Sequence, residues 1–189
     1  MDAQPRIRAS IMQDHLRDLR ALPEWAEIGR DFGPQNIRTV EDASRVGWVA
    51  GDVNFAMVRA IHHQVGLERG QEFFYKRFAA AWDSPIFQPI VRGAMRMLRA
   101  DPGGLLSMIP KGHGLAFRGF GRYEVVEKTS HSLSLRHFEV PAECFVDDAA
   151  WIRFAGFSQL SLIALADGEG TVEWSIDASR REAVHHFAW

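Results

Sequence analysis

A chain of 189 residues in which 47% are hydrophobic has enough apolar surface for one packed domain, and it is short for two independent cores. Its 22 Lys and Arg residues are offset by 24 Asp and Glu residues, so the formal net charge of −2 disfavours general binding to nucleic acid. Cys144 is the only cysteine, which excludes an internal disulfide and a thiolate metal cluster built by one chain.

The expected cellular location follows from the same features. The N-terminal segment has no apolar core of signal-peptide length, and no stretch approaches the roughly 20 apolar residues that span a bilayer. A single cysteine also fits a reducing compartment. We therefore expect a cytoplasmic protein without membrane insertion.

Hydrophobic periodicity predicts helices through most of the N-terminal half. Apolar residues recur at three- and four-residue steps, and Pro, Gly and Asp residues mark the helix ends. We expect one helix to end before Pro23, another to stop at Gly66, and a short one capped by Asp101 to be ended by Pro110. Residues 37–51 are ambiguous. The predicted helices span residues 7–22, part of 23–36, 52–65, 68–82, 84–98 and 101–109.

Four glycines beside basic residues, between residues 111 and 122, resemble a phosphate-binding loop at first sight. No Gly-Lys-Ser or Gly-Lys-Thr follows, and the next predicted element is a strand, which excludes a Walker loop and a dinucleotide-binding fingerprint. We expect Gly112 to Gly121 to connect a helix to a sheet, because glycines permit positive φ and close backbone approach. Arg118 in this connector is a candidate anchor for an anionic head group at the mouth of a cavity.

The hydrophobic period changes to two after this stretch. Alternation over residues 122–140 predicts an antiparallel hairpin, and residues 170–189 predict a second one. Between them, Asp147 and Asp148 begin a long apolar helix that Gly168 ends. The side chains expected to face one another are Tyr123, Val125 and Glu127 with Leu133, Leu135 and Phe138, and Val172, Trp174 and Ile176 with Val184, His186 and Ala188.

These elements together predict an α+β fold in a single domain over residues 1–189. N-terminal helices accompany a four-stranded antiparallel sheet of two hairpins, which packs on one long helix. Trp151, Phe154 and Leu160 of that helix are expected to be buried.

The histidines offer an alternative, a metal site. His62 and His63 are adjacent on a predicted helix and point about 100° apart, so we expect His62 near the apolar face and His63 outside it. His185 and His186 lie in a strand, where one side chain should be buried and the other exposed. No metal is the main prediction. The ligands of the alternative are His62, His113 and His186.

Aromatic density is the most informative feature, with thirteen Phe and six Trp residues that either frame an apolar cavity or fill it. No nucleophile elbow or catalytic triad is evident. The carboxylates beside Cys144 are expected to raise the pKa of its thiol, so we predict a passive cysteine and no enzyme. The candidate ligand-binding residues are Phe74, Phe78, His113, Phe117, Arg118 and Trp151.

Three stretches carry a resemblance to known proteins: residues 100–141, the helix "AAWIRFAGFSQLSLIALADG" and the strand "GTVEWSI". They resemble a family of paralogous myxobacterial proteins. Their layout is similar to the superfamily of ligand-binding domains that includes heme nitric-oxide-binding sensors, 4-vinyl reductase domains and the Bet3-type subunits of Golgi transport particles. The resemblance covers about residues 70 to 178. It makes residues 1–69 a variable helical part and residues 70–189 a ligand-binding-like α+β core.

The resemblance implies a small-ligand sensor or a dimeric adaptor with a cavity between helices and sheet. The heme sensors place an axial histidine on the short helix before the hairpin and a Tyr-x-Ser-x-Arg motif in the second strand. Here the helix "DPGGLLSMIP" has no histidine, and the strand "LSLRHFE" has no such motif. One cysteine also cannot form the zinc-type cysteine pattern of some 4-vinyl reductase domains. The sequence therefore predicts no cofactor, with heme as the alternative.

The expected function is that of a non-enzymatic regulatory or sensory module. It would bind an apolar or aromatic small molecule or a protein partner, as a homodimer, and no nucleic acid. A heme- or metal-binding sensor or redox protein is one alternative, and a purely structural dimeric adaptor is the other.

Overall fold

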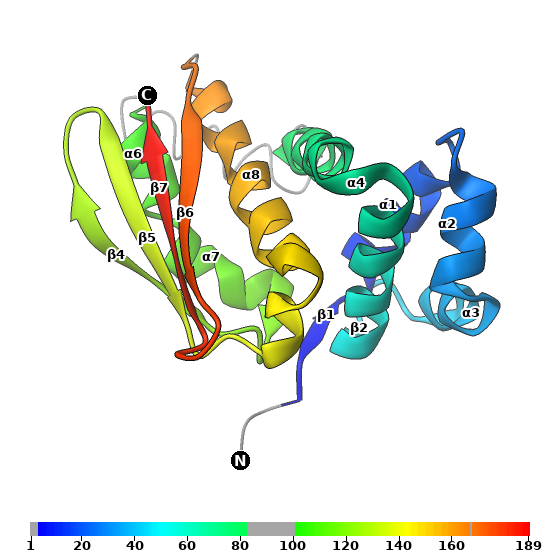
Figure 1. Cartoon of the computed structure of the whole chain (residues 1–189). Coiled ribbons are helices and arrows are strands. Elements are labelled where there is room, and N and C mark those ends of the chain that lie inside the picture. Colours follow the sequence, from blue (N-terminus) through cyan, green and yellow to red (C-terminus); the bar gives the residue numbers. More distant parts are fainter. Residues whose placement is uncertain (1–3, 83–100, 167) are drawn as a thin grey trace.

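Helix α8 (Ala150–Leu165) divides the molecule into a helical part and a sheet part (Figure 1). The computed structural model describes residues 4–82, 101–166 and 168–189. Helices α1 (Ala9–Leu19), α2 (Trp25–Phe32), α3 (Pro34–Asp42) and α4 (Gly51–Trp82) lie on one side of α8, and a four-stranded sheet lies on the other. The α+β prediction is confirmed.

A small three-stranded sheet is formed by strands before α1, between α3 and α4, and after α7 (Ile109–Ala116). Strands β1 (Arg6–Arg8), β2 (Trp48–Ala50) and β3 (Phe117–Arg118) pair in the order β2-β1-β3, with Ile7 opposite Val49. The predicted helix over residues 7–22 was therefore wrong at its start, because Ile7 belongs to a strand that tertiary pairing creates. The ambiguous residues 37–51 hold both the end of α3 and all of β2.

The two helices predicted over residues 52–65 and 68–82 join into α4, which is kinked at Gly66 (φ 78°). Helix α6 (Pro102–Leu106) begins where the Asp101 carboxylate accepts hydrogen bonds from two backbone amides. Helix α7 (Ile109–Ala116) was not predicted: Pro110 lies in its first turn and does not end a helix. Part of the expected glycine connector is therefore helical. The helix expected over residues 84–98 lies outside the described residues.

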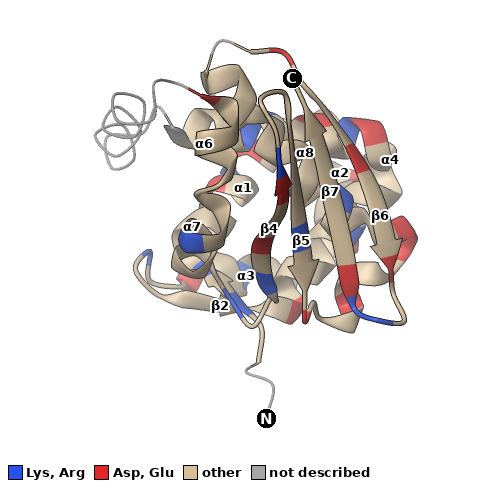
Figure 2. Ribbon diagram, turned by 90° about the vertical axis from the view of Figure 1, so that its left-hand side faces the viewer, with Lys and Arg blue, Asp and Glu red and all other residues tan. Residues whose placement is uncertain are grey.

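The four-stranded sheet is antiparallel throughout, and Figure 2 shows its face with the strand order β4-β5-β7-β6. Its strands are β4 (Arg122–Lys128), β5 (Ser132–Phe138), β6 (Thr171–Asp177) and β7 (Glu182–Ala188). Trp174 pairs with His185, and Tyr123 pairs with His137. The expected inner faces were therefore wrong by one residue in β7 and at the end of β5: His185 and His137 are buried, whereas His186 is exposed.

Helix α8 follows two short 3-10 turns, η1 (Ala142–Phe145) and η2 (Asp147–Ala149). It is apolar around most of its circumference because α4 packs on one side and the sheet on the other. Trp151, Phe154 and Leu160 are buried, as predicted. Among the described residues, none of the helices combines the length and the hydropathy needed to cross a membrane.

Candidate ligand site

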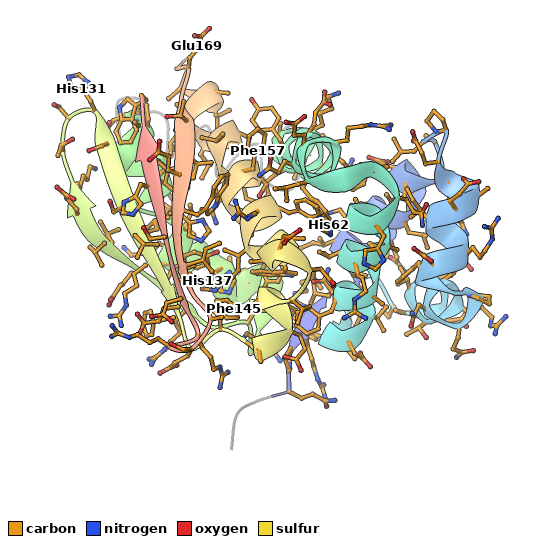
Figure 3. The ribbon with its side chains drawn as sticks, viewed as in Figure 1. His62, His131, His137, Phe145, Phe157 and Glu169 are labelled. Carbon is orange, nitrogen blue, oxygen red and sulfur yellow. The ribbon has the colours of Figure 1, made fainter. Side chains whose placement is uncertain are left out.

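Six aromatic rings, each from a different element, meet between α7, α8 and the inner face of the four-stranded sheet. The side chains of this ring cluster are His113, Phe117, Tyr123, His137, Trp151 and His185. Figure 3 labels His137, which β5 places on the side of the sheet that faces α8. The cluster joins the helical connector, the sheet and the long helix in one place.

Ring contacts run continuously through the cluster. The His113 ring stacks on Phe117 with centroids 5.0 Å apart and meets the edge of Tyr123 at the same distance. Tyr123 in turn stacks on His137 at 4.0 Å, with an angle of 9° between the ring planes. His185 lies 5.9 Å from the Tyr123 centroid. The imidazoles are therefore packed among aromatic rings rather than against carboxylates.

Several polar atoms of this region are buried and have no hydrogen-bond partner in the described part of the chain. They are His113 Nε2, His137 Nδ1, Gln159 Oε1, Trp174 Nε1 and both ring nitrogens of His185. The Nε2 atom of His137 lies 2.8 Å from the carbonyl oxygen of Phe120 and donates to it, which leaves Nδ1 with its lone pair. A buried polar atom without a partner costs about 1–3 kcal/mol, so this set favours a bound group that satisfies it.

Burial keeps the imidazoles of the cluster neutral at physiological pH. It lowers the pKa of His113 to about 4, and burial followed by the nearby charge of His186 lowers that of His185 to about 3. The pKa of His137 also lies well below its ordinary value, because of burial first and then the neighbouring histidines. A neutral imidazole offers a lone pair to a metal or to a hydrogen-bond donor.

Three of the six predicted ligand residues, His113, Phe117 and Trp151, meet in the ring cluster. The other aromatic candidates lie elsewhere: Phe74 stacks on Phe154 between α4 and α8, with centroids 5.1 Å apart, and Phe78 packs beside the sheet-side core. Their predicted place in one site with His113 finds no support in these contacts, because α4 presents them to different neighbours.

Arg118 does not face the cluster. It is exposed on the three-stranded sheet, where its guanidinium carbon lies 4.1 Å from the centroid of the Trp48 ring. Successive residues of a strand point to opposite faces, so Phe117 turns inward and Arg118 outward. The expectation that Arg118 lines the mouth of this cavity was therefore wrong.

The three histidines of the metal alternative are far from forming one site. His62 lies between α4 and α8, with Nε2 3.9 Å from Asp148 Oδ2, and Figure 3 shows it on the other side of α8 from His137. His186 is exposed on the outer face of the sheet beside the hydroxyls of Ser134 and Ser175. No set of three or more metal-binding side chains was found within the described ranges.

Cys144 is buried, and its surroundings disfavour the reactive thiolate form. Burial, followed by the charge of Glu143, raises the pKa of its thiol well above the ordinary value. This agrees with the passive role predicted from its acidic neighbours.

The sequence prediction missed Tyr123, His137 and His185 as members of the site. Strict alternation from the buried Leu133 and Leu135 leads to residue 137, and this signal was present in the sequence. The assignment of Phe138 to the inner face passed over it.

Comparisons with known proteins show the fold but no sequence relative. No protein-family model and no curated protein sequence matches the chain. A mutant H-NOX protein from K. algicida in the Fe(II) unliganded form matches with a TM-score of 0.71 and 11% identity, over 96% of each chain. The Fe(II)NO form of an H-NOX protein from S. oneidensis matches with a TM-score of 0.56 and 10% identity, over 96% of this chain and 98% of its own.

A third solved structure has a TM-score of 0.60 and 10% identity. Its description concerns changes in heme redox potential through distortion of the porphyrin by the protein. It covers 97% of this chain and 100% of its own. The likeness in fold to these structures therefore extends over nearly the whole chain, including the helices before residue 70. The resemblances to the myxobacterial family, to 4-vinyl reductase domains and to Bet3-type subunits stay predictions.

These matches contradict the prediction of no cofactor. The matched structures are described as an Fe(II) form, an Fe(II)NO form and a heme protein. Heme, which was the alternative prediction, therefore replaces the prediction of no cofactor as the group to be tested. Because the sequence identities are only 10–11%, these matches show that the chain shares the fold of H-NOX proteins and nothing beyond the fold.

Proposed function

We propose that this chain is a non-enzymatic sensory module that binds heme, with His113 as the axial ligand. The observation that carries the proposal is the Nε2 atom of His113, which is buried without a hydrogen-bond partner among the described residues. Helix α7 holds this imidazole against the rings of Phe117 and Tyr123. The H-NOX fold adds support from an independent direction.

The residues of the ring cluster fit a heme group chemically. A heme iron takes a neutral imidazole nitrogen, and the pKa of about 4 keeps His113 neutral under physiological conditions. The neighbouring aromatic rings offer the apolar surface that a porphyrin buries. When bound, heme would supply an iron at which a diatomic gas can coordinate.

Heme binding requires the rings around His113 to separate. Trp151 lines a pocket of about 10 Å³, room for about one water molecule, but this pocket lies on the side of Phe55 and Asp147 and does not border His113. Phe117 meanwhile contacts both His113 and Trp151. We therefore expect loading with heme to change the environment of Trp151 and to quench tryptophan fluorescence.

Titration of the purified chain with hemin tests this function. We expect one hemin per chain and an absorbance spectrum of histidine-ligated heme. The His113→Ala variant should lose that spectrum while retaining its circular dichroism. His131→Ala is the matched control, because His131 is exposed at the β4–β5 turn.

Three results would overturn the proposal. The first is a chain that binds no hemin, and the second is a His113→Ala variant whose spectrum equals that of the unmodified protein. The third is loss of the spectrum in His137→Phe but not in His113→Ala, which would assign the ligand to β5 instead of α7.

A further inference from the structure

Three arginines share the outer face of the three-stranded sheet. Arg6 lies directly opposite Arg118 across the β1–β3 pair, and Arg8 lies opposite Trp48 across the β1–β2 pair. Figure 2 shows Lys and Arg segments gathered on the strands beside β2. We call Arg6, Arg8, Trp48 and Arg118 the arginine face.

The guanidinium groups of this face are not neutralised by the described chain. Arg6, Arg8 and Arg118 form no ion pair with any carboxylate of the described residues. By contrast, Arg136 on the four-stranded sheet lies 2.9 Å from a Glu124 carboxylate oxygen and 2.7 Å from one of Glu182. The arginine face therefore keeps its positive charge available to another molecule.

The existing contacts of the face hold its side chains in place without cancelling their charge. The Arg8 guanidinium donates to the carbonyl oxygens of Leu115 and Val46, each at 3.0 Å, and its central carbon lies 4.2 Å from the Trp48 ring centroid. Arg118 approaches the same ring at 4.1 Å. These contacts orient the groups in advance and so reduce the entropy lost when a partner binds.

Like charges directly opposite on neighbouring strands destabilise a sheet, and Arg6 and Arg118 stand in that relation. A negatively charged partner would relieve this repulsion as well as gain attraction to each guanidinium. An anion should therefore bind this face more tightly than it would bind three arginines that lie far from one another.

Apolar side chains beside the arginines identify the kind of anion. Val46 is 82% exposed and Leu115 is 67% exposed, and the backbone carbonyls of both accept from Arg8. Arginine and tryptophan beside exposed apolar residues are typical of the centres of protein interfaces. A free phosphate would leave these apolar groups in water, whereas a polypeptide can cover them.

We propose that the arginine face docks an acidic segment of a protein partner. Carboxylates of the segment bind Arg6, Arg8 and Arg118, and its apolar side chains cover Val46 and Leu115. Strand β3 carries this face on its outer side and Phe117 of the ring cluster on its inner side. The docking surface is thus adjacent to the candidate ligand site, although its occupation does not depend on heme.

Fluorescence anisotropy with a labelled, short peptide rich in glutamate and leucine tests this docking on the chain without heme. A glutamine-for-glutamate version of the peptide is the probe control. We expect the acidic peptide to bind, and raising the salt from about 50 to about 300 mM to weaken binding several-fold. Arg6→Gln and Arg118→Gln should each weaken it by roughly tenfold.

Arg122→Gln is the matched protein control, because Arg122 is also exposed but lies in β4 of the four-stranded sheet and pairs with Glu139. The Arg6 side chain makes no hydrogen bond or ion pair with the described residues, and only the backbone of Arg6 joins the sheet, so Arg6→Gln tests the proposal even if Arg118→Gln disturbs the fold. Absence of binding, an equal loss in Arg122→Gln, or tighter binding of a single-stranded DNA oligonucleotide of equal charge would overturn the proposal.

Discussion

Replacement of Gly156 by alanine tests how closely α8 packs on the sheet. A Cβ at this position would collide with His185 Nδ1 and would lie 2.5 Å from Trp174 Nε1, which is about 1 Å short of ordinary contact. The His185 ring cannot turn away freely, because it is fully buried on the inner face. Overpacking of this kind costs up to about 3 kcal/mol, and the better helix propensity of alanine offsets about 1 kcal/mol. We expect a net loss of about 2 kcal/mol.

Urea denaturation followed by far-ultraviolet circular dichroism measures this loss. Gly114→Ala in α7 is the matched control, since a Cβ added at that position would meet no atom within 4 Å. The control should be as stable as the unmodified protein or gain up to about 1 kcal/mol. If Gly156→Ala were as stable as the control, α8 would not approach the sheet as described.

Three further changes test separate contacts. His185→Phe removes an imidazole that binds a proton in the unfolded chain but not in the fold until the pH approaches about 3, so the unmodified protein should lose stability as the pH falls below about 6.5. For each pH unit below about 6.5, the free energy of unfolding of His185→Phe should fall by about 1.4 kcal/mol less than that of the unmodified protein. Urea titrations at several pH values measure this, and an equal dependence on pH in the two proteins would contradict it. Trp151→Phe deprives the buried Asn54 Oδ1 of its 2.8 Å hydrogen bond and should cost about 1–3 kcal/mol, measured as a lower Tm. Asp18→Asn breaks the ion pair with the largely buried Arg77 and should cost about 1–2 kcal/mol, and an unchanged Tm would remove this pair from the contacts that join α1 to α4.

Local signals in the sequence predicted most of the helices. Gly66 marks a break in the helical pattern, and the structure places the kink of α4 at that residue. The short strands β1, β2 and β3 carried no comparable signal, because two or three residues are too few for a period and only tertiary pairing forms them. Pro110 shows a different ambiguity, since a proline fits the first turn of a new helix as well as the position after an old one.

The sequence predicted only part of the candidate site. His113, Phe117 and Trp151 were expected near a ligand and come together, because aromatic density reflects the core that encloses them. His185 was missed because a shift of one residue in a strand exchanges its two faces. Arg118 was placed on the wrong side for the same reason, in a strand too short to be recognised from sequence.

Rescue by free imidazole is the most direct measurement of the claim that His113 holds the heme iron. The His113→Ala variant is mixed with hemin, and its absorbance spectrum is recorded before and after imidazole is added. We predict that the spectrum differs from that of the unmodified protein at first and returns to it with imidazole. A variant whose spectrum already equals that of the unmodified protein, or never approaches it, would contradict the role of His113.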